Sequence, residues 1–285
     1  MNVSQVMPKL SLQPFQATTY PLDTSLVRKI TAHFSGYAAR RAVLMKEQLL
    51  GVGGGFDVSW GHAEAWAPPE RLRIGYVCAD FRKHPLAYLV QNMFGMHDHS
   101  RFDVRCYATT PGDGSPFRDT ISRGCGSFYE VHDLEDVELA QRVNRDRIQV
   151  LIDLNGFTAG GKLELYAMQA SPLQALPGVA YFGSTGSDAT DYYISDRIGT
   201  PPELACTFGR GGPDCTFAEK IVMMPNSYQP NDYLQSSIES MSRGPQPRSE
   251  IQATHQIPDS AFVYVNFNSY QKIEPVLFNA WYCLV

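Results

Sequence analysis

Short apolar runs alternate with amphipathic stretches over most of this 285-residue chain. A short apolar run is typical of a buried strand, and apolar residues that recur every three to four positions are typical of a helix. Strands that alternate with helices pair in parallel through right-handed crossovers. The pattern therefore predicts an α/β fold built on a parallel sheet. The predicted strands cover residues 72–79, 102–109, 148–155, 173–182, 191–196 and 261–268.

Capping residues support the predicted helices. In the stretch 20–50, Asp23 or Thr24 can cap the first turn. Pro85 stands at the first position of a predicted helix, where the missing N–H costs nothing. The predicted helices cover residues 20–50, 85–97, 134–147, 162–169 and 274–285.

Composition shifts along the chain predict its domain organisation. The glycine run inside 51–70 follows no strand and precedes no Lys-Ser/Thr pair, so we interpret it as a linker and not as a phosphate-binding loop. The last strand and helix are too few to make a domain, and we expect them to open a second lobe that is truncated here. The predicted segments are an irregular N-terminus (1–19), a helical lead-in (20–50), a linker (51–70), a main lobe (71–236), a second linker (237–260) and the start of the second lobe (261–285).

Charge and cysteine content exclude several classes of protein. The net charge is −5 with both signs interspersed, which argues against nucleic acid or an anionic membrane as the partner. The N-terminus lacks the pattern of a secretory signal, and no apolar run approaches the ~20 residues of a membrane span. None of the six cysteines forms a CxxC pair, which argues against a zinc site. We expect all six to be buried or incidental thiols, in a reducing cytoplasmic or nuclear compartment.

The residues that could carry chemistry lie in loops that follow predicted strands. In an open parallel sheet, ligands bind at the carboxyl ends of the strands. His84 lies after the first strand and directly before Pro85, at the start of a helix whose dipole disfavours the imidazolium form. A neutral imidazole there can accept a proton or donate a hydrogen bond to a substrate oxygen. The alternative is a capping histidine without chemistry.

Two further loops carry small polar residues. Asn155, Gly156 and Thr158 offer groups that suit sugar hydroxyls or a peptide backbone, although a simple turn would use the same residues. A later loop has small residues whose backbone N–H groups can face an anion or a sugar, again a weak signal by itself. This loop consists of Gly183, Ser184, Thr185 and Gly186.

Six segments occur in a fixed order and together are more specific than any one loop. Each resembles a segment of the catalytic region of the O-GlcNAc transferase family, enzymes that transfer N-acetylglucosamine from UDP-GlcNAc to Ser and Thr hydroxyls of intracellular proteins. The segments are "LRIGYVCADFRKHPLAYLV", "FDVRCYATTPGDGSPFR", "IQVLIDLNGFTAGGKLELYAMQASPLQA", "YFGSTGSDATDYYISD", "EKIVMMPNSYQPND" and "VYVNFNSYQKIEP".

The resemblance implies a two-lobed GT-B glycosyltransferase with Rossmann-like lobes, inverting and independent of metal or other cofactor. His84 falls on the histidine of the family's "DF..HP" motif, which is discussed as a base or a sugar contact. Residues Gly183 to Gly186 fall on a loop that borders the sugar. Lys272 falls on the lysine that contacts the diphosphate of the donor. The implied partners are the UDP-sugar and proteins that bear Ser or Thr.

The sequence also departs from the family pattern. It reads "AYFGSTG" where the family commonly has "GYPGTSG", and Gln271 replaces a tyrosine before Lys272. Residues 205–217 look like an additional loop, and the 34-residue period of tetratricopeptide repeats is absent. With most of the second lobe missing, we expect weak or no UDP binding. The alternatives are a protein O-fucosyltransferase of the same fold, which would use a GDP-sugar, and a non-catalytic fragment that binds peptides or partners.

Overall fold

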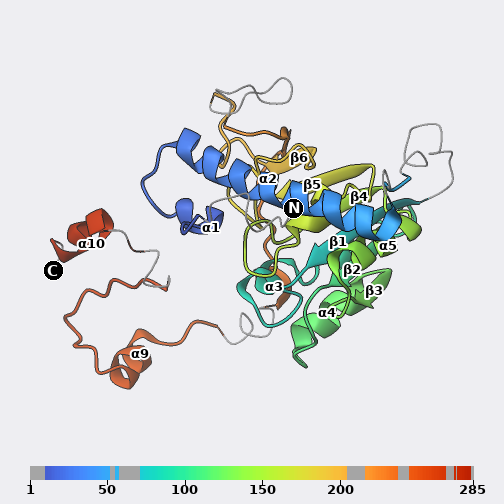
Figure 1. Cartoon of the computed structure of the whole chain (residues 1–285). Coiled ribbons are helices and arrows are strands. Elements are labelled where there is room, and N and C mark those ends of the chain that lie inside the picture. The colour runs from blue at the N-terminus through green and yellow to red at the C-terminus, as the bar shows by residue number, and fades with distance from the viewer. Residues whose placement is uncertain are drawn as a thin grey trace. The chain divides into compact units, whose positions relative to one another are not determined.

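The computed structural model describes residues 10–51, 55–57, 71–203, 216–236, 244–267, 273 and 275–283 (Figure 1). The chain divides into two compact units, Met1–Gln235 and Ser236–Val285.

The first unit is built on a sheet of seven strands in the order β3-β2-β1-β4-β5-β6-β7. Every neighbouring pair is parallel, so the predicted α/β fold with a parallel sheet is confirmed. The strands are β1 (Leu72–Cys78), β2 (Phe102–Ala108), β3 (Ser127–Glu130), β4 (Val150–Asp153), β5 (Leu173–Pro177), β6 (Tyr192–Ser195) and β7 (Lys220–Met223).

Helices cover both faces of the sheet, because successive side chains of a strand point to opposite faces. On β1, Tyr76 and Cys78 join a core that is closed by the helices after β1 and β2. Val77, between them, joins a second core on the other face. The helices of this unit are α1 (Pro14–Ala17), α2 (Thr24–Leu50), α3 (Pro85–Val90), the 3-10 helix η4 (Met93–Met96), α4 (Pro116–Gly124), α5 (Asp136–Arg145), α6 (Leu163–Ala167) and α7 (Tyr233–Ser236).

Helix α2 begins where the sequence predicts. Asp23 is its N-cap, and the carboxylate accepts a hydrogen bond from Ser25 N at 2.8 Å. The helix packs against α1, α5 and α6 along one side of the sheet (Figure 1). Ala38 and Ala42 are buried on it, and these small side chains allow close approach to the helices beneath. The lead-in helix is therefore an integral layer of the first unit.

Several elements differ from the prediction. The predicted helix over 85–97 is two short pieces, α3 and η4, separated by a turn. The N-terminal region, expected to be irregular, contains α1, whose Ala17 is fully buried. The elements β3, α4, β7 and α7 were not predicted. Both missed strands are four residues long and lie at the edges of the sheet, where only part of the apolar pattern of a buried strand is needed.

The expectation of six free thiols is wrong for two of them. Cys106 on β2 and Cys125 after α4 form a disulfide. Cys78 and Cys283 are free, and Cys206 and Cys215 lie outside the described residues. The sequence does not predict this pairing, because the pairing depends on the packing of α4, a helix that was not predicted either.

The second unit contains α9 (Arg248–Thr254) within the predicted linker and α10 (Pro275–Tyr282) within the predicted last helix. Residues 261–267 form no strand, contrary to prediction, and Phe262 and Phe267 are largely exposed. A single strand is not stable without neighbours to pair with. Within the described residues, no helix is both long and apolar enough to cross a bilayer.

Candidate functional site

The loop after β1, residues 79–84, is fixed by hydrogen bonds from three other segments, and we call it the His84 loop. Ala79 N donates to Asn155 Oδ1 at 2.7 Å, and Ala79 O accepts from Thr110 Oγ1 at 2.6 Å. Phe81 O accepts from Arg118 Nη1 at 2.7 Å. Bonds to backbone atoms leave the loop little freedom, so its backbone is held in a fixed position.

Two more contacts complete the anchoring of this loop. Lys83 N donates to Asp113 Oδ2 at 2.8 Å, and this bond is the main reason why the pKa of Asp113 falls to about 2. The Phe81 ring is fully buried and lies against Phe94 and Phe128, with ring centroids 5.4 Å and 6.0 Å away. An apolar anchor thus fixes the middle of a loop that is otherwise polar.

His84 is the N-cap of α3, as its position before Pro85 suggests. Its Nδ1 accepts a hydrogen bond from Leu86 N at 3.3 Å and lies 3.7 Å from Asp80 Oδ2. Because Nδ1 acts as an acceptor, the proton of the neutral ring resides on Nε2. The side chain is 40% exposed, so the ring is open to solvent although its base is held.

Asn155 connects the loop after β4 to the His84 loop. The side chain is buried, and its Nδ2 donates to Asp80 Oδ2 at 2.8 Å and to Thr158 Oγ1 at 3.2 Å. Asn155 Oδ1 accepts from Ala79 N, so both the amide nitrogen and the amide oxygen of this side chain have partners inside the protein. Asn155 therefore positions the two loops relative to each other.

Glycines allow the loop after β4, residues 155–161, to lie against its neighbours. Gly156 has φ 56°, and a Cβ on it would lie 2.7 Å from Tyr181 Cβ. Gly160 has φ 83°, and a Cβ there would lie 2.5 Å from Ala79 Cβ. No side chain fits at either position.

Asp153 Oδ1 accepts from Asn155 N and Gly156 N, and burial raises the pKa of this carboxyl to about 6.

The loop Gly183–Gly186 after β5 is bound to a buried carboxylate that sequence analysis missed. Glu219 accepts hydrogen bonds from Ser184 Oγ at 2.7 Å, from Thr185 N at 2.6 Å and from Thr185 Oγ1. Burial raises the pKa of Glu219. On the other side, Ser35 Oγ of α2 donates to Thr185 O at 2.6 Å. The loop is thus held between α2 and the segment before β7.

These bonds determine which backbone N–H groups of the Gly183–Gly186 loop remain available to a ligand. Gly183 N donates to Tyr181 O and Gly186 N donates to Ser184 Oγ, so three of the four backbone N–H groups have partners inside the protein. The expectation that these N–H groups face an anion or a sugar does not hold for those three. Gly183 and Ser184 instead line a cavity of about 320 Å³.

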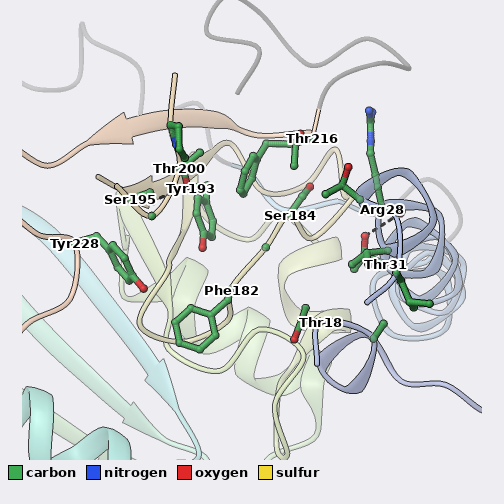
Figure 2. Close-up of a pocket in the computed structure, with 18 of the residues that line it drawn as sticks. Thr18, Arg28, Thr31, Phe182, Ser184, Tyr193, Ser195, Thr200, Thr216 and Tyr228 are labelled. Atoms are coloured by element: carbon green, nitrogen blue, oxygen red, sulfur yellow. Dashed lines mark hydrogen bonds between the residues drawn. The ribbon is translucent and has the colours of Figure 1, made fainter. Parts of the chain in front are cut away.

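Figure 2 shows this cavity between α2 and the loops after β5 and β6. Aromatic rings of Phe182, Tyr193 and Tyr228 and hydroxyl groups of Thr18 and Thr31 line it, with the Arg28 side chain at its edge. His84, Asn155 and Thr158 do not line it.

The structure therefore brings some of the predicted residues together and not others. His84, Asn155, Gly156 and Thr158 belong to one connected group, through Asp80 and the backbone at Ala79. Residues 183–186 follow the neighbouring strand β5 and meet that group through Tyr181. Lys272 lies outside the described residues. In the described part of the chain, no group of three or more His, Cys, Asp or Glu residues is placed to hold a metal ion.

Comparison with known proteins gives a consistent match. The sequence model of glycosyl transferase family 41 matches residues 5–242. A protein from Arabidopsis thaliana, named as probable UDP-N-acetylglucosamine–peptide N-acetylglucosaminyltransferase SEC, is 32% identical over 99% of this chain. A protein of the same enzyme name from Caenorhabditis elegans is 34% identical over 79% of this chain.

The chain covers only a small part of each of these two relatives. The chain spans 27% of the Arabidopsis protein and 18% of the Caenorhabditis protein. Among solved structures, a mutant of the O-GlcNAc transferase of Thermobaculum terrenum matches with a TM-score of 0.60 at 24% identity. The match covers 76% of this chain and 37% of that one, and it supports the same fold.

Proposed function

This chain belongs to glycosyl transferase family 41, and we propose that it supplies acceptor- and sugar-side groups of an enzyme that transfers N-acetylglucosamine from UDP-GlcNAc to Ser and Thr hydroxyls of proteins. Two relatives bear the name of this activity. The observation that carries the proposal is the position of His84. It lies at the carboxyl edge of the parallel sheet, where ligands bind in such folds, in a loop anchored from three segments.

The reaction that we propose is a single displacement. The acceptor hydroxyl oxygen attacks the anomeric carbon of the sugar, the bond from that carbon to the diphosphate oxygen breaks, and the configuration inverts. The hydroxyl proton leaves to solvent or to a nearby base. Correct placement of the hydroxyl can supply about 7–11 kcal/mol of the barrier.

In this reaction we assign His84 a donor role. Nδ1 already accepts from Leu86 N, so the neutral ring has an N–H at Nε2 and no free acceptor. Such a ring can donate a hydrogen bond to an oxygen of the sugar or the diphosphate. It cannot take the proton of the acceptor hydroxyl unless the cap to Leu86 is first broken. The donor role is therefore favoured over the base role.

The assignments of Gly183–Gly186 and Lys272 follow from the resemblance, and those of Asn155 and Thr158 follow from the polar groups of their loop. We propose that Thr158 and the loop Gly183–Gly186 border the sugar and that Asn155 holds them in register. Lys272 would stabilise the charge on the departing diphosphate, a role of the kind that is often the largest single contribution to catalysis. We propose transfer without a metal or another cofactor, on protein substrates of the cytoplasm or nucleus.

The test measures transfer by the natural gene product that carries residues 1–285. It is incubated with UDP-GlcNAc and a peptide rich in Ser and Thr, and the peptide is examined by mass spectrometry for one added N-acetylhexosamine. A parallel reaction contains GDP-fucose. Addition from UDP-GlcNAc alone is expected, whereas addition from GDP-fucose alone would reject the proposed donor.

A further inference from the structure

The disulfide Cys106–Cys125 encloses the segment that anchors the His84 loop. Cys106 lies on β2 and Cys125 is the C-cap of α4, at a sequence separation of 19. We propose that this disulfide is a redox switch: closed, it holds the His84 loop in place through Arg118, and reduction releases that loop. The effect on catalysis rests on the proposed function, whereas the effect on the loop does not.

Three anchors of the His84 loop come from the enclosed segment. Thr110 Oγ1 donates to Ala79 O at 2.6 Å, Asp113 Oδ2 accepts from Lys83 N at 2.8 Å, and Arg118 Nη1 donates to Phe81 O at 2.7 Å. Asn155 provides the fourth, from the loop after β4. Any movement of residues 106–125 relative to β1 therefore disturbs three of the four hydrogen bonds that fix the His84 loop.

Arg118 is the residue through which the disulfide acts. Its side chain is buried, and besides Phe81 O it binds Thr110 O at 2.8 Å and Glu130 Oε1 at 3.0 Å. Its guanidinium also stacks on the Phe128 ring, with Cζ 5.3 Å from the ring centroid. A planar guanidinium can keep hydrogen bonds to this many fixed partners only while the backbone of its own residue stays in place. Arg118 is thus a positioning residue for His84.

The helix that bears Arg118 has few other attachments. In the sequence PFRDTISRG of α4, Phe117 and Ile121 are the apolar residues that join the core. Gly124 packs against Gly95, where an added Cβ would lie 2.9 Å from the Gly95 nitrogen. The covalent bond at Cys125 ties the end of this small helix to β2, in addition to the pairing of β3 with β2 that begins at Ser127. Without that bond, the contacts of Arg118, the two apolar side chains and the backbone contact with Gly95 remain to hold the helix.

The reduction that we propose uses a dithiol. One thiolate attacks the sulfur of Cys125, which is the more exposed partner at 9% against 0% for Cys106, and Cys106 leaves as a thiolate. The second thiol of the reductant then displaces Cys125. The protein gains two electrons and two protons as two thiols, and the dithiol becomes a cyclic disulfide. In cytosolic proteins, disulfides are usually transient or redox-sensing.

The experiment compares hydrogen exchange of the oxidised protein and the protein reduced with dithiothreitol. Alkylation and mass spectrometry establish the state of Cys106 and Cys125 in each sample. We expect the amides of Lys83 and Leu86 to exchange at least ~10-fold faster after reduction, because their hydrogen-bond partners move. The amides of β6 should not change, which shows that the sheet remains folded.

Variants separate this disulfide from the other cysteines. In the variant Cys125→Ala, the amides of Lys83 and Leu86 should exchange at the fast rate both with and without reductant. Cys283→Ser, which removes an exposed free thiol, and the double variant Cys206→Ser/Cys215→Ser should keep the full redox response. In the variant Arg118→Lys, the amide of Lys83 should exchange fast even with the disulfide closed, since the lysine ammonium cannot reproduce the hydrogen bonds of the planar guanidinium. If reduction unfolds the protein globally, this last variant still tests the role of Arg118.

Transfer activity provides the second measurement. We expect kcat for transfer from UDP-GlcNAc to fall roughly 10- to 100-fold on reduction, because small displacements of a catalytic group are costly. Equal exchange at Lys83 and Leu86 in both redox states would overturn the inference, as would alkylation of both cysteines after treatment with an oxidant. If exchange responds but neither form transfers sugar, the switch stands and the proposed function fails.

Discussion

Asn155 Nδ2 donates a hydrogen bond to Asp80 Oδ2 at 2.8 Å, and this bond connects the loops that follow the adjacent strands β1 and β4. Both side chains are buried, and Asp80 Oδ2 also lies 3.7 Å from His84 Nδ1. The position of the exposed histidine thus depends on a buried amide 71 positions later in the sequence than itself. We expect this bond to contribute to stability as well as to function.

Replacing Asn155 with Ala tests that bond. The change leaves Ala79 N and Asp80 Oδ2 without partners in the interior, where each unsatisfied group costs about 1–3 kcal/mol. We expect the free energy of unfolding in urea to fall by about 2–4 kcal/mol. Asn226→Ala, at an exposed position, should change it by less than about 0.5 kcal/mol. Equal stability of the two variants would contradict the assigned role.

Asp153 predicts a pH dependence of stability. Burial raises the pKa of its carboxyl to about 6 in the folded protein, against 3.8 as the ordinary value. The unfolded chain therefore ionises first, and stability that is present below about pH 4 is lost as the pH rises through about 6, by up to about 3 kcal/mol.

The measurement is urea unfolding at a series of pH values across that window. Asp153→Asn keeps an oxygen for Asn155 N and Gly156 N and should reduce the slope, with Glu219, whose pKa burial also raises, contributing to what remains. Asp133→Asn, at an exposed carboxyl, should retain it. A slope in Asp153→Asn as steep as in the parent would assign the pH dependence to another group.

Glu219→Gln is predicted to destabilise the protein although it removes a buried charge. Ser184 Oγ donates to Glu219 Oε2 and accepts from Gly186 N and Ala218 N, so its hydroxyl proton must point at residue 219. A glutamine amide that keeps Thr185 on its oxygen presents N–H groups to that proton. We expect a loss of about 1–3 kcal/mol in thermal or urea unfolding. Added stability would show that the charge, and not the hydrogen bonding, dominates.

The disulfide predicts a stability difference of its own. Replacing both Cys106 and Cys125 with Ala should lower the free energy of unfolding by about 2–4 kcal/mol, the range expected for a bridge of this loop length. The single change Cys283→Ala, at an exposed free thiol, serves as the control. A double variant as stable as the parent under oxidising conditions would mean that the bridge carries no stabilisation.

The sequence predicts the parts of the fold that are local. Five predicted strands overlap β1, β2, β4, β5 and β6, because each is an apolar run beside a helical pattern. The cap by Asp23 and the start of α3 at Pro85 are also local signals. The edge strands β3 and β7 carry too little of the pattern to be recognised.

The supporting residues of the site could not be predicted in the same way. Arg118 binds Phe81, which is 37 positions away in sequence, and Glu219 binds Thr185, which is 34 positions away, and nothing near them signals those partners. The pairing of Cys106 with Cys125 likewise depends on the tertiary packing of α4. His84 could be found because its motif is contiguous, but which of its nitrogens is free could be known only from the contact with Leu86.

The central claim is that His84 serves transfer from UDP-GlcNAc, and the variant His84→Asn tests it most directly. Asparagine is an equally good N-cap for α3, so thermal stability should change little, while the donor at Nε2 is lost. With the gene product that carries residues 1–285, we predict addition of N-acetylhexosamine to the acceptor peptide by the parent and a loss of at least ~100-fold in kcat for the variant. Undiminished transfer by a folded His84→Asn protein would contradict the account.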